Sequence, residues 1–215
     1  MLTAVPQVPP AVPLVPVSID ATSSASIAFP AATAVHMRRS QLNVLDDETS
    51  TFTGTLRTQS HTALGRRVVL LQAYRGHRWR TLTRARTRAN GRFRLSFVPR
   101  RLGSQLVRVS FPGDPFDLPV LRRLGRLTVY RLAGASWYGG GGGLACGGEL
   151  TSSTLGVANK TLPCGTMVTL HYGGHTVRVP VVDRGPFVAG RDFDLTEATK
   201  AALGFGDTGD VWSTR

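Results

Sequence analysis

Cysteine, methionine and tryptophan are scarce in this sequence. Its 215 residues include 2 cysteines, 3 methionines and 3 tryptophans. No apolar run reaches about eighteen residues, so no transmembrane helix is predicted. The two cysteines have neither a Cys-x-x-Cys spacing nor a neighbouring histidine to complete a zinc site. His171 and His175 flank a Gly-Gly turn without a third ligand nearby, and we predict no metal and no cofactor.

Lysine is almost absent as well. Of the 26 basic residues, 24 are arginine and 2 are lysine, which is typical of codon bias in a GC-rich genome. Residues 41–131 hold 18 arginines and 5 acidic residues, whereas residues 132–215 hold 6 basic and 7 acidic ones. The net charge of +13 therefore belongs to the middle of the chain. No nucleic-acid motif and no aromatic-interleaved platform accompanies it, so no specific nucleic-acid partner is predicted.

The first forty residues are rich in proline, alanine and serine. This composition favours an extended, unpacked segment, and we predict a disordered leader over residues 1–40. No basic residue precedes Arg38, and proline breaks the apolar stretch, so a secretory signal peptide is not visible. Either the start of the gene is misplaced, or export follows a route that the sequence does not show.

Residues 41–132 have the pattern of short β-strands separated by turn residues. The strand-like runs are 51–56, 67–74, 79–83, 92–97, 105–111 and 126–131. Asn90-Gly91 lies between two of these runs and predicts a β-hairpin. Strands of this number and spacing predict an immunoglobulin-like β-sandwich. Arginines alternate with apolar residues at 92–95, which is typical of a strand with one buried and one solvated face.

The most informative run in the chain is 181–195. A strand-like stretch ends there in Asp183-Arg184-Gly185-Pro186. Gly185 is free to take a positive φ and Pro186 fixes its own φ, so the sequence predicts a rigid corner. A rigid corner holds a side chain at a fixed angle, as a functional site requires. From the spacing alone, however, a tight turn whose charges face water is the favoured interpretation.

Further motifs precede and follow this corner. They are Ala135-Ser136-Trp137-Tyr138-Gly139, Ala145-Cys146-Gly147, Gly156-Val157-Ala158-Asn159-Lys160-Thr161-Leu162-Pro163-Cys164-Gly165-Thr166, Asp183-Arg184-Gly185-Pro186-Phe187 and Asp194-Leu195-Thr196. Their order and spacing over residues 133–215 resembles the rare lipoprotein A family. The resemblance implies a mainly β chain that ends in a six-stranded double-psi β-barrel with one short helix. It also implies an extracellular or cell-envelope protein of bacteria that acts on peptidoglycan glycan strands.

The resemblance implies the chemistry of a lytic transglycosylase. A carboxyl group protonates the glycosidic oxygen, and the C6 hydroxyl of muramic acid traps the oxocarbenium centre. Asp183, at the end of a strand, is the predicted acid/base. Asp194 is the second predicted catalytic residue. Its alternative role is to cap, or place charge at, the N-terminus of a helix over residues 196–203.

The sequence departs from the family pattern at two positions. The family site combines a glutamate, a histidine and the aspartate of the Asp-Arg-Gly-Pro turn. Matching residue by residue, the glutamate falls on Gly148 and the histidine on Asn159, and only Asp183 is kept. Glu149 is one position away, so in a strand it would point to the opposite face unless a loop absorbs the offset. Asn159 can form hydrogen bonds but carries no proton at neutral pH.

Tyr138, Glu149, Asn159 and Arg184 are the predicted substrate-binding residues. Tyr138 stands just before five glycines at 139–143, which predict a flexible tip, and its ring suits either the core or a sugar-binding surface. Two alternatives to an enzyme remain. One is a non-catalytic module that binds peptidoglycan or scaffolds partners through the same groove, and the other is a purely structural barrel.

Cys146 and Cys164 both lie inside the family motifs. We predict a disulfide between them, with two buried free thiols as the alternative. Such a bridge stabilises a fold by roughly 3 kcal/mol in the loop-entropy model and persists outside the cytosol, which favours an envelope location.

For the basic residues 41–131 we predict adhesion to anionic wall polymers. The alternative is a spacer domain whose outer face is charged.

Overall fold

The structure, a computed structural model, describes residues 29–38 and 40–215, which form a mainly β fold with one α-helix. Most of the predicted leader, residues 1–28, lies outside the described residues. Its last part is strand β1 (Thr33–Met37), which pairs with strand β3. The predicted boundary of the leader at residue 40 is therefore wrong, because alternate side chains of this segment, such as Val35, are buried in the core.

The first half of the chain, from residue 29 and without residue 39, contains eight described strands. They are β1 (Thr33–Met37), β2 (Asn43–Leu45), β3 (Ser50–Thr58), β4 (Val68–Arg75), β5 (Arg78–Arg86), β6 (Arg92–Phe97), β7 (Gly103–Phe111) and β8 (Val120–Tyr138). The six strand-like runs of the sequence coincide with β3 to β8 and are confirmed. Two sheets enclose one core here: β1-β3-β6, and a second sheet made of β5, β4, β7, β8 and β2. Leu56 and Leu95 reach this core from the first sheet, and Val69 and Val109 reach it from the second.

The turn at Asn90-Gly91 does not close the predicted hairpin. Strand β5 pairs with β4, whereas β6 pairs with β3, so the turn connects strands of different sheets. Gly91 has a φ of 75° and accepts a hydrogen bond from the Leu56 amide, and the Asn90 side chain accepts one from the Arg92 amide. The hairpin prediction is wrong because turn residues specify the turn and not the partner of the strand that follows.

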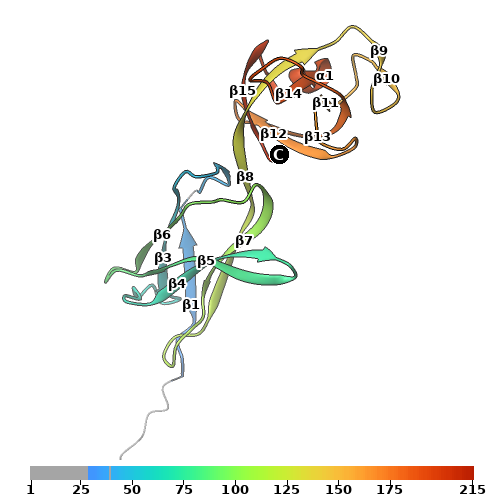
Figure 1. The fold of residues 1–215 in the computed structure, drawn as a ribbon. Helices are drawn as coiled ribbons and strands as arrows, with labels where there is room; N and C mark the ends of the chain where they lie inside the picture. Colours follow the sequence, from blue (N-terminus) through green and yellow to red (C-terminus); the bar gives the residue numbers. More distant parts are fainter. Residues whose placement is uncertain (1–28, 39) are drawn as a thin grey trace, which may run out of the picture.

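Strand β8 runs through both halves of the molecule (Figure 1). Its first part pairs with β7 and β2, and its last part pairs with β15 and β14. Its buried side chains pass from the first core, at Leu127 and Val129, to a second core, at Ala133 and Ala135. The two halves are therefore joined by one continuous strand.

A cluster of aromatic rings lies where the halves meet. The ring of Tyr130 lies 5.7 Å from that of His171 and 5.9 Å from that of Trp212. The Tyr130 hydroxyl donates a hydrogen bond to the Asn43 side chain of β2, 3.2 Å away. His171 shares a 2.7 Å hydrogen bond with Thr176, and burial lowers the pKa of the His171 imidazole. The junction is thus packed by side chains from both halves.

The second half contains further strands and the helix. They are β9 (Gly142–Gly143), β10 (Glu149–Leu150), β11 (Val157–Ala158), β12 (Met167–Tyr172), β13 (His175–Asp183), β14 (Phe193–Thr196), α1 (Glu197–Leu203) and β15 (Thr208–Ser213). Strands β14, β11, β13, β12, β15 and β8 pair in that order, and β14 also pairs with β8. Apolar side chains of these strands form the second core, together with Leu203 of α1.

Helix α1 is bounded by specific capping residues. Thr196 is the N-cap, and its side chain accepts a hydrogen bond from the Thr199 amide. Gly204 ends the helix with a φ of 64°, a conformation that glycine adopts without strain. Across residues 29–38 and 40–215, we find no helix with the length and apolar character needed to cross a membrane.

Candidate functional site

Strand β13 ends in the aspartate of the Asp-Arg-Gly-Pro corner. Gly185 has the predicted positive φ, 127°. Asp183 is half-buried, and its Oδ1 accepts hydrogen bonds from the amides of Ala145, at 2.9 Å, and Arg184, at 2.8 Å. Two backbone donors on one oxygen fix the plane of the carboxylate. Neither amide engages its Oδ2, and the Tyr138 hydroxyl lies within hydrogen-bonding reach of the same carboxylate.

Asp183 and Asp194 lie on one line across neighbouring strands. Ala158 of β11 pairs with Asp183 on one side and with Asp194 of β14 on the other, and Asp194 pairs in turn with Ser136 of β8. The register of β11 against β13 shifts just before Ala158, which brings Asp183 rather than Val182 opposite it. The structure therefore places both predicted catalytic aspartates on the same sheet, about 9–10 Å apart at their Cα atoms.

Asp194 is held by a side chain of strand β8. The Ser136 hydroxyl donates a short hydrogen bond to its Oδ1. The carboxylate does not cap helix α1, because Thr196 occupies the N-cap position. The capping alternative for Asp194 is therefore wrong, since the helix begins two residues later than that role requires.

Tyr138 brings a buried hydroxyl group to the two aspartates. This hydroxyl makes no well-aligned hydrogen bond with the described residues. Burial raises the pKa of Tyr138, and the charge of Asp183, a hydrogen bond to Asp183 and the charge of Asp194 raise it further, in that order. The hydroxyl is therefore protonated at neutral pH, and it lies within hydrogen-bonding reach of the Asp183 carboxylate.

The loop before β10 holds the position where the family has a glutamate. Gly148 has a φ of 84°, which L-residues rarely adopt, so a side chain is disfavoured there. Glu149 is exposed in β10 and pairs with Gly143. The structure gives no contact between Glu149 and Asp183 within the described part of the chain. The substrate-binding role of Glu149 stays a prediction.

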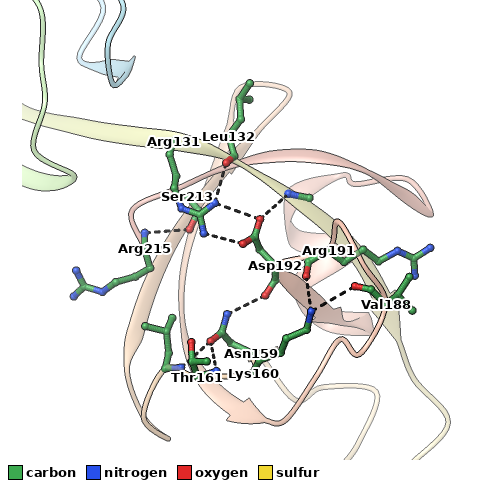
Figure 2. A network of polar contacts seen from close by, with 12 residues as sticks. Arg131, Leu132, Asn159, Lys160, Thr161, Val188, Arg191, Asp192, Ser213 and Arg215 are labelled. Carbon is green, nitrogen blue, oxygen red and sulfur yellow. Dashed lines mark hydrogen bonds and ion pairs between the residues drawn. The ribbon is translucent and has the colours of Figure 1, made fainter.

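Asn159, at the position of the family's histidine, holds the local fold together (Figure 2). Its Oδ1 accepts hydrogen bonds from the amides of Thr161 and Leu162, at 3.0 and 2.8 Å. Its Nδ2 donates to the Asp192 carbonyl at 2.9 Å, and its own amide donates to the Asp183 carbonyl at 3.1 Å. Since the side chain is buried and engaged, its contribution to a site is to position the backbone of Asp183.

Arg184 is turned towards the same loop. Its guanidinium donates to the carbonyls of Asn159 and Leu162, at 3.2 and 3.0 Å, and to the sulfur of Cys164, at 3.0 Å. These contacts tie the corner after β13 to the segment 159–164. These donors are engaged by the protein itself. Binding of substrate by Arg184 stays a prediction.

Asp192 connects this site to the junction between the halves (Figure 2). Its carboxylate is paired with the Arg131 guanidinium of β8, at 3.1 Å, and accepts a hydrogen bond from the Gly134 amide. Its carbonyl accepts the hydrogen bond from Asn159. A continuous set of polar contacts therefore leads from Arg131 through Asp192 and Asn159 to the backbone of Asp183.

Cys146 and Cys164 form a disulfide, as predicted, with a Cα–Cα distance of 5.5 Å. The bridge lies next to the candidate site. The Cys146 amide donates to the Val182 carbonyl of β13, and the sulfur of Cys164 accepts from Arg184. It therefore links the loop that contacts Asp183 to the segment that contacts Arg184.

Sequence reasoning missed two residues that support the site, Ser136 and Asp192. Ser136 stands in a recognised motif, but only the pairing of β8 with β14 brings it to Asp194. Asp192 stands in the informative run 181–195, yet its ion pair with Arg131 joins residues that are 61 positions apart. Such long-range contacts leave no local pattern in the sequence.

The barrel half of this chain is similar to a described family of proteins. Residues 132–211 match a family model described as lytic transglycolase. A probable endolytic peptidoglycan transglycosylase RlpA of Synechocystis is 40% identical over 89 residues, which cover 38% of this chain and 28% of the relative. The protein of the same name from Aquifex aeolicus is 37% identical over 128 residues, which cover 54% of each chain. The solved structure of a Streptomyces papain inhibitor is 28% identical with a TM-score of 0.33, and the match covers 40% of this chain and 94% of that one.

This chain spans from about a quarter to about half of the length of the two curated relatives. The match of the family model begins within β8 and ends within β15, so it includes all the strands that carry the candidate site. Residues 132–211 of this chain therefore form a double-psi β-barrel domain of the rare lipoprotein A type.

Proposed function

We propose that the barrel domain cleaves peptidoglycan glycan strands as an endolytic lytic transglycosylase, with Asp183 as the acid/base. The observation that carries this proposal is the state of the Asp183 carboxylate. Its Oδ1 is fixed by two backbone amides, neither of which engages Oδ2, and the Tyr138 hydroxyl lies beside the carboxylate as a further donor. The names of the two curated relatives, both probable endolytic peptidoglycan transglycosylases, supply the substrate class.

In the proposed reaction, protonated Asp183 gives its proton to the glycosidic oxygen while the bond from that oxygen to C1 of muramic acid breaks. Positive charge develops at C1, and the C6 hydroxyl of the same sugar attacks C1 to form the 1,6-anhydro ring. The proton of that hydroxyl returns to Asp183. One carboxyl group thus serves as acid and then as base, and no water enters the products.

Asp194 and Tyr138 supply the remaining polar groups. The Asp194 carboxylate, oriented by Ser136, places negative charge on the same sheet, where it stabilises the positive charge that develops at C1. The Tyr138 hydroxyl, buried beside Asp183, is suited to orient that carboxyl group as a hydrogen-bond donor. In this proposal these two groups act in place of the glutamate and histidine of the family pattern.

A non-catalytic peptidoglycan-binding module is the second candidate function. Two observations favour it: Gly148 has a backbone that disfavours a glutamate, and Asn159 is occupied by structural hydrogen bonds. In this case the same site would hold a glycan strand beside Asp183 without cleaving it.

We further propose an extracellular or cell-envelope location, because the Cys146–Cys164 bridge requires an oxidising compartment and because peptidoglycan lies there.

We also propose that the first half is an immunoglobulin-like sandwich. Its two sheets share one core, and its turn at 90–91 passes from one sheet to the other, as a sandwich requires.

Digestion of purified sacculi by the full chain, with released products identified by mass spectrometry, tests the function. We expect anhydro-muropeptides from the wild type and only background from Asp183→Asn. Asp210→Asn is the matched control, because Asp210 is exposed on β15. If the wild type releases nothing but sediments with peptide-free glycan strands, the enzyme proposal fails and the binding module replaces it. Anhydro products from Asp183→Asn would contradict the assignment of the acid/base.

A further inference from the structure

A groove lined by arginine lies on the first half of the molecule, away from the barrel site. Its floor is the middle strand of the sheet β1-β3-β6, where Thr53 and Thr55 point away from the core. Its lining includes Arg38, Arg88, Arg92 and Arg94 and no acidic residue, and its volume is about 600 Å³.

The strand register arranges the basic side chains as two walls. His36 of β1 and Arg92 of β6 flank Thr55 from opposite sides. Two residues earlier on β3, the Thr53 carbonyl accepts a hydrogen bond from the Arg38 amide, and Thr53 pairs with Arg94 of β6. Residues two positions apart on a strand are separated by about 6.8 Å, so Arg92 and Arg94 recur at that interval along one wall, and His36 and Arg38 along the other.

The arginines of the groove are not neutralised by the protein. The ion pairs among residues 29–38 and 40–215 involve other basic residues, at positions 67, 100, 131 and 200. Arg38, Arg88, Arg92 and Arg94 are exposed, so their guanidinium groups meet solvent. Four cations around a floor of hydroxyl groups form an environment of strong positive potential that attracts anions.

We propose that this groove binds an extended polymer of phosphodiester groups that lacks nucleobases, such as a polyol-phosphate chain. Guanidinium groups recognise phosphate oxygens through paired hydrogen bonds, and hydroxyl groups on the floor donate further ones. The groove follows a strand and has a wall on either side, which fits a linear chain with regularly spaced charges.

The absence of aromatic platforms separates this ligand from a nucleic acid. Binding of single strands uses exposed rings on which bases stack. Phe93, the aromatic residue in the lining, is buried in the core with 4% of its surface exposed. The groove therefore offers phosphate contacts and no surface for bases. This site does not involve the barrel, so the proposal is tested independently of the proposed enzyme.

Binding of a fluorescent poly(glycerol phosphate) to the full chain, measured at several salt concentrations, tests the proposal. We expect Arg92→Gln/Arg94→Gln to weaken binding about tenfold or more, and to lower the slope of log affinity against log salt by about two. Arg80→Gln/Arg84→Gln is the matched control. Both residues are exposed on β5, outside the groove and outside the ion pairs of the described residues, and we expect a change below about threefold.

Three results would overturn the proposal. The first is an equal loss in both double variants, which would mean that net charge alone binds the polymer. The second is tighter binding of a single-stranded oligonucleotide with the same number of phosphates, which would make a nucleic acid the ligand. The third is the absence of binding by the wild type at low salt. Thermal unfolding of each variant confirms that the comparison is made between folded proteins.

Discussion

Asp183 and Asp194 pair with the same residue, Ala158, from opposite sides of the short strand β11. This arrangement gives the two carboxylates a fixed separation that no flexible loop controls. Asp183 is oriented by backbone amides and Asp194 by the Ser136 hydroxyl. The two groups are therefore suited to different tasks, proton transfer for Asp183 and stabilisation of charge for Asp194.

We expect Asp194→Asn to slow the release of anhydro-muropeptides by about tenfold to a hundredfold, because it removes one oriented charge from the transition state. Asp183→Asn removes the proton carrier and should leave only background. Initial rates on purified sacculi, with far-ultraviolet circular dichroism to verify folding, distinguish the two variants. A wild-type rate in Asp194→Asn would remove this residue from the mechanism.

Asn159→His, which restores the residue type of the family, should destabilise this protein instead of activating it. The imidazole cannot reproduce two accepted amide bonds and one donated bond, so buried backbone groups lose their partners at a cost of about 2–4 kcal/mol in the free energy of unfolding. Asn159→Asp keeps the acceptor oxygen and should lose less. Urea unfolding measures both, and a stable, more active Asn159→His variant would contradict the structural role.

Gly156 should not tolerate a side chain. A Cβ there would overlap the methyl groups of Val182, and we expect Gly156→Ala to lower the free energy of unfolding by about 1–3 kcal/mol. The double variant Gly156→Ala/Val182→Ala should be more stable than the sum of the single effects, because the overlap is relieved. Gly143→Ala is the control, since its Cβ would meet open space. Strict additivity of the two substitutions in urea unfolding would show that the overlap is not the cause.

Stability should fall as the pH drops below neutrality, because of His171. Burial lowers the pKa of His171 in the folded protein, while the unfolded chain binds the proton near the ordinary value of 6.5. The unfolded state therefore takes up a proton first as the pH falls through 6.5, and the free energy of unfolding decreases. His171→Phe keeps a ring beside Tyr130 and Trp212 but does not titrate. Melting temperatures between pH 7.5 and pH 5 should show a smaller decrease for this variant, and an unchanged decrease would contradict the assignment.

The sequence allowed the strands and the disulfide to be predicted because both leave local patterns. Alternation of apolar residues marked six strands of the first half, and the motifs of the second half identified the barrel and the pair Cys146–Cys164. Strand β1 was missed because it follows a long stretch rich in proline and alanine, and its five residues contain few of the strongly apolar ones. Its burial depends on a partner, β3, that lies elsewhere in the chain.

The candidate site could be predicted only in part, for a related reason. Asp183 was found because it stands in a rigid corner that local sequence defines. The register shift that brings it opposite Ala158 depends on how β11 meets β13, and the hydrogen bonds that engage Asn159 depend on the loop at Asp192. Such features arise from tertiary packing, which overrides local preference at the positions where it acts.

The uninterrupted course of β8 has a mechanical consequence. A strand of 19 residues measures roughly 60 Å when extended, and this one is fixed to both halves by hydrogen bonds along most of its length. The aromatic cluster at Tyr130 and the ion pair of Arg131 with Asp192 resist bending at its midpoint. A protein anchored through its first half would therefore hold its barrel at a fixed distance from the anchor. A pulling force on the anchor would act directly on the backbone of β8.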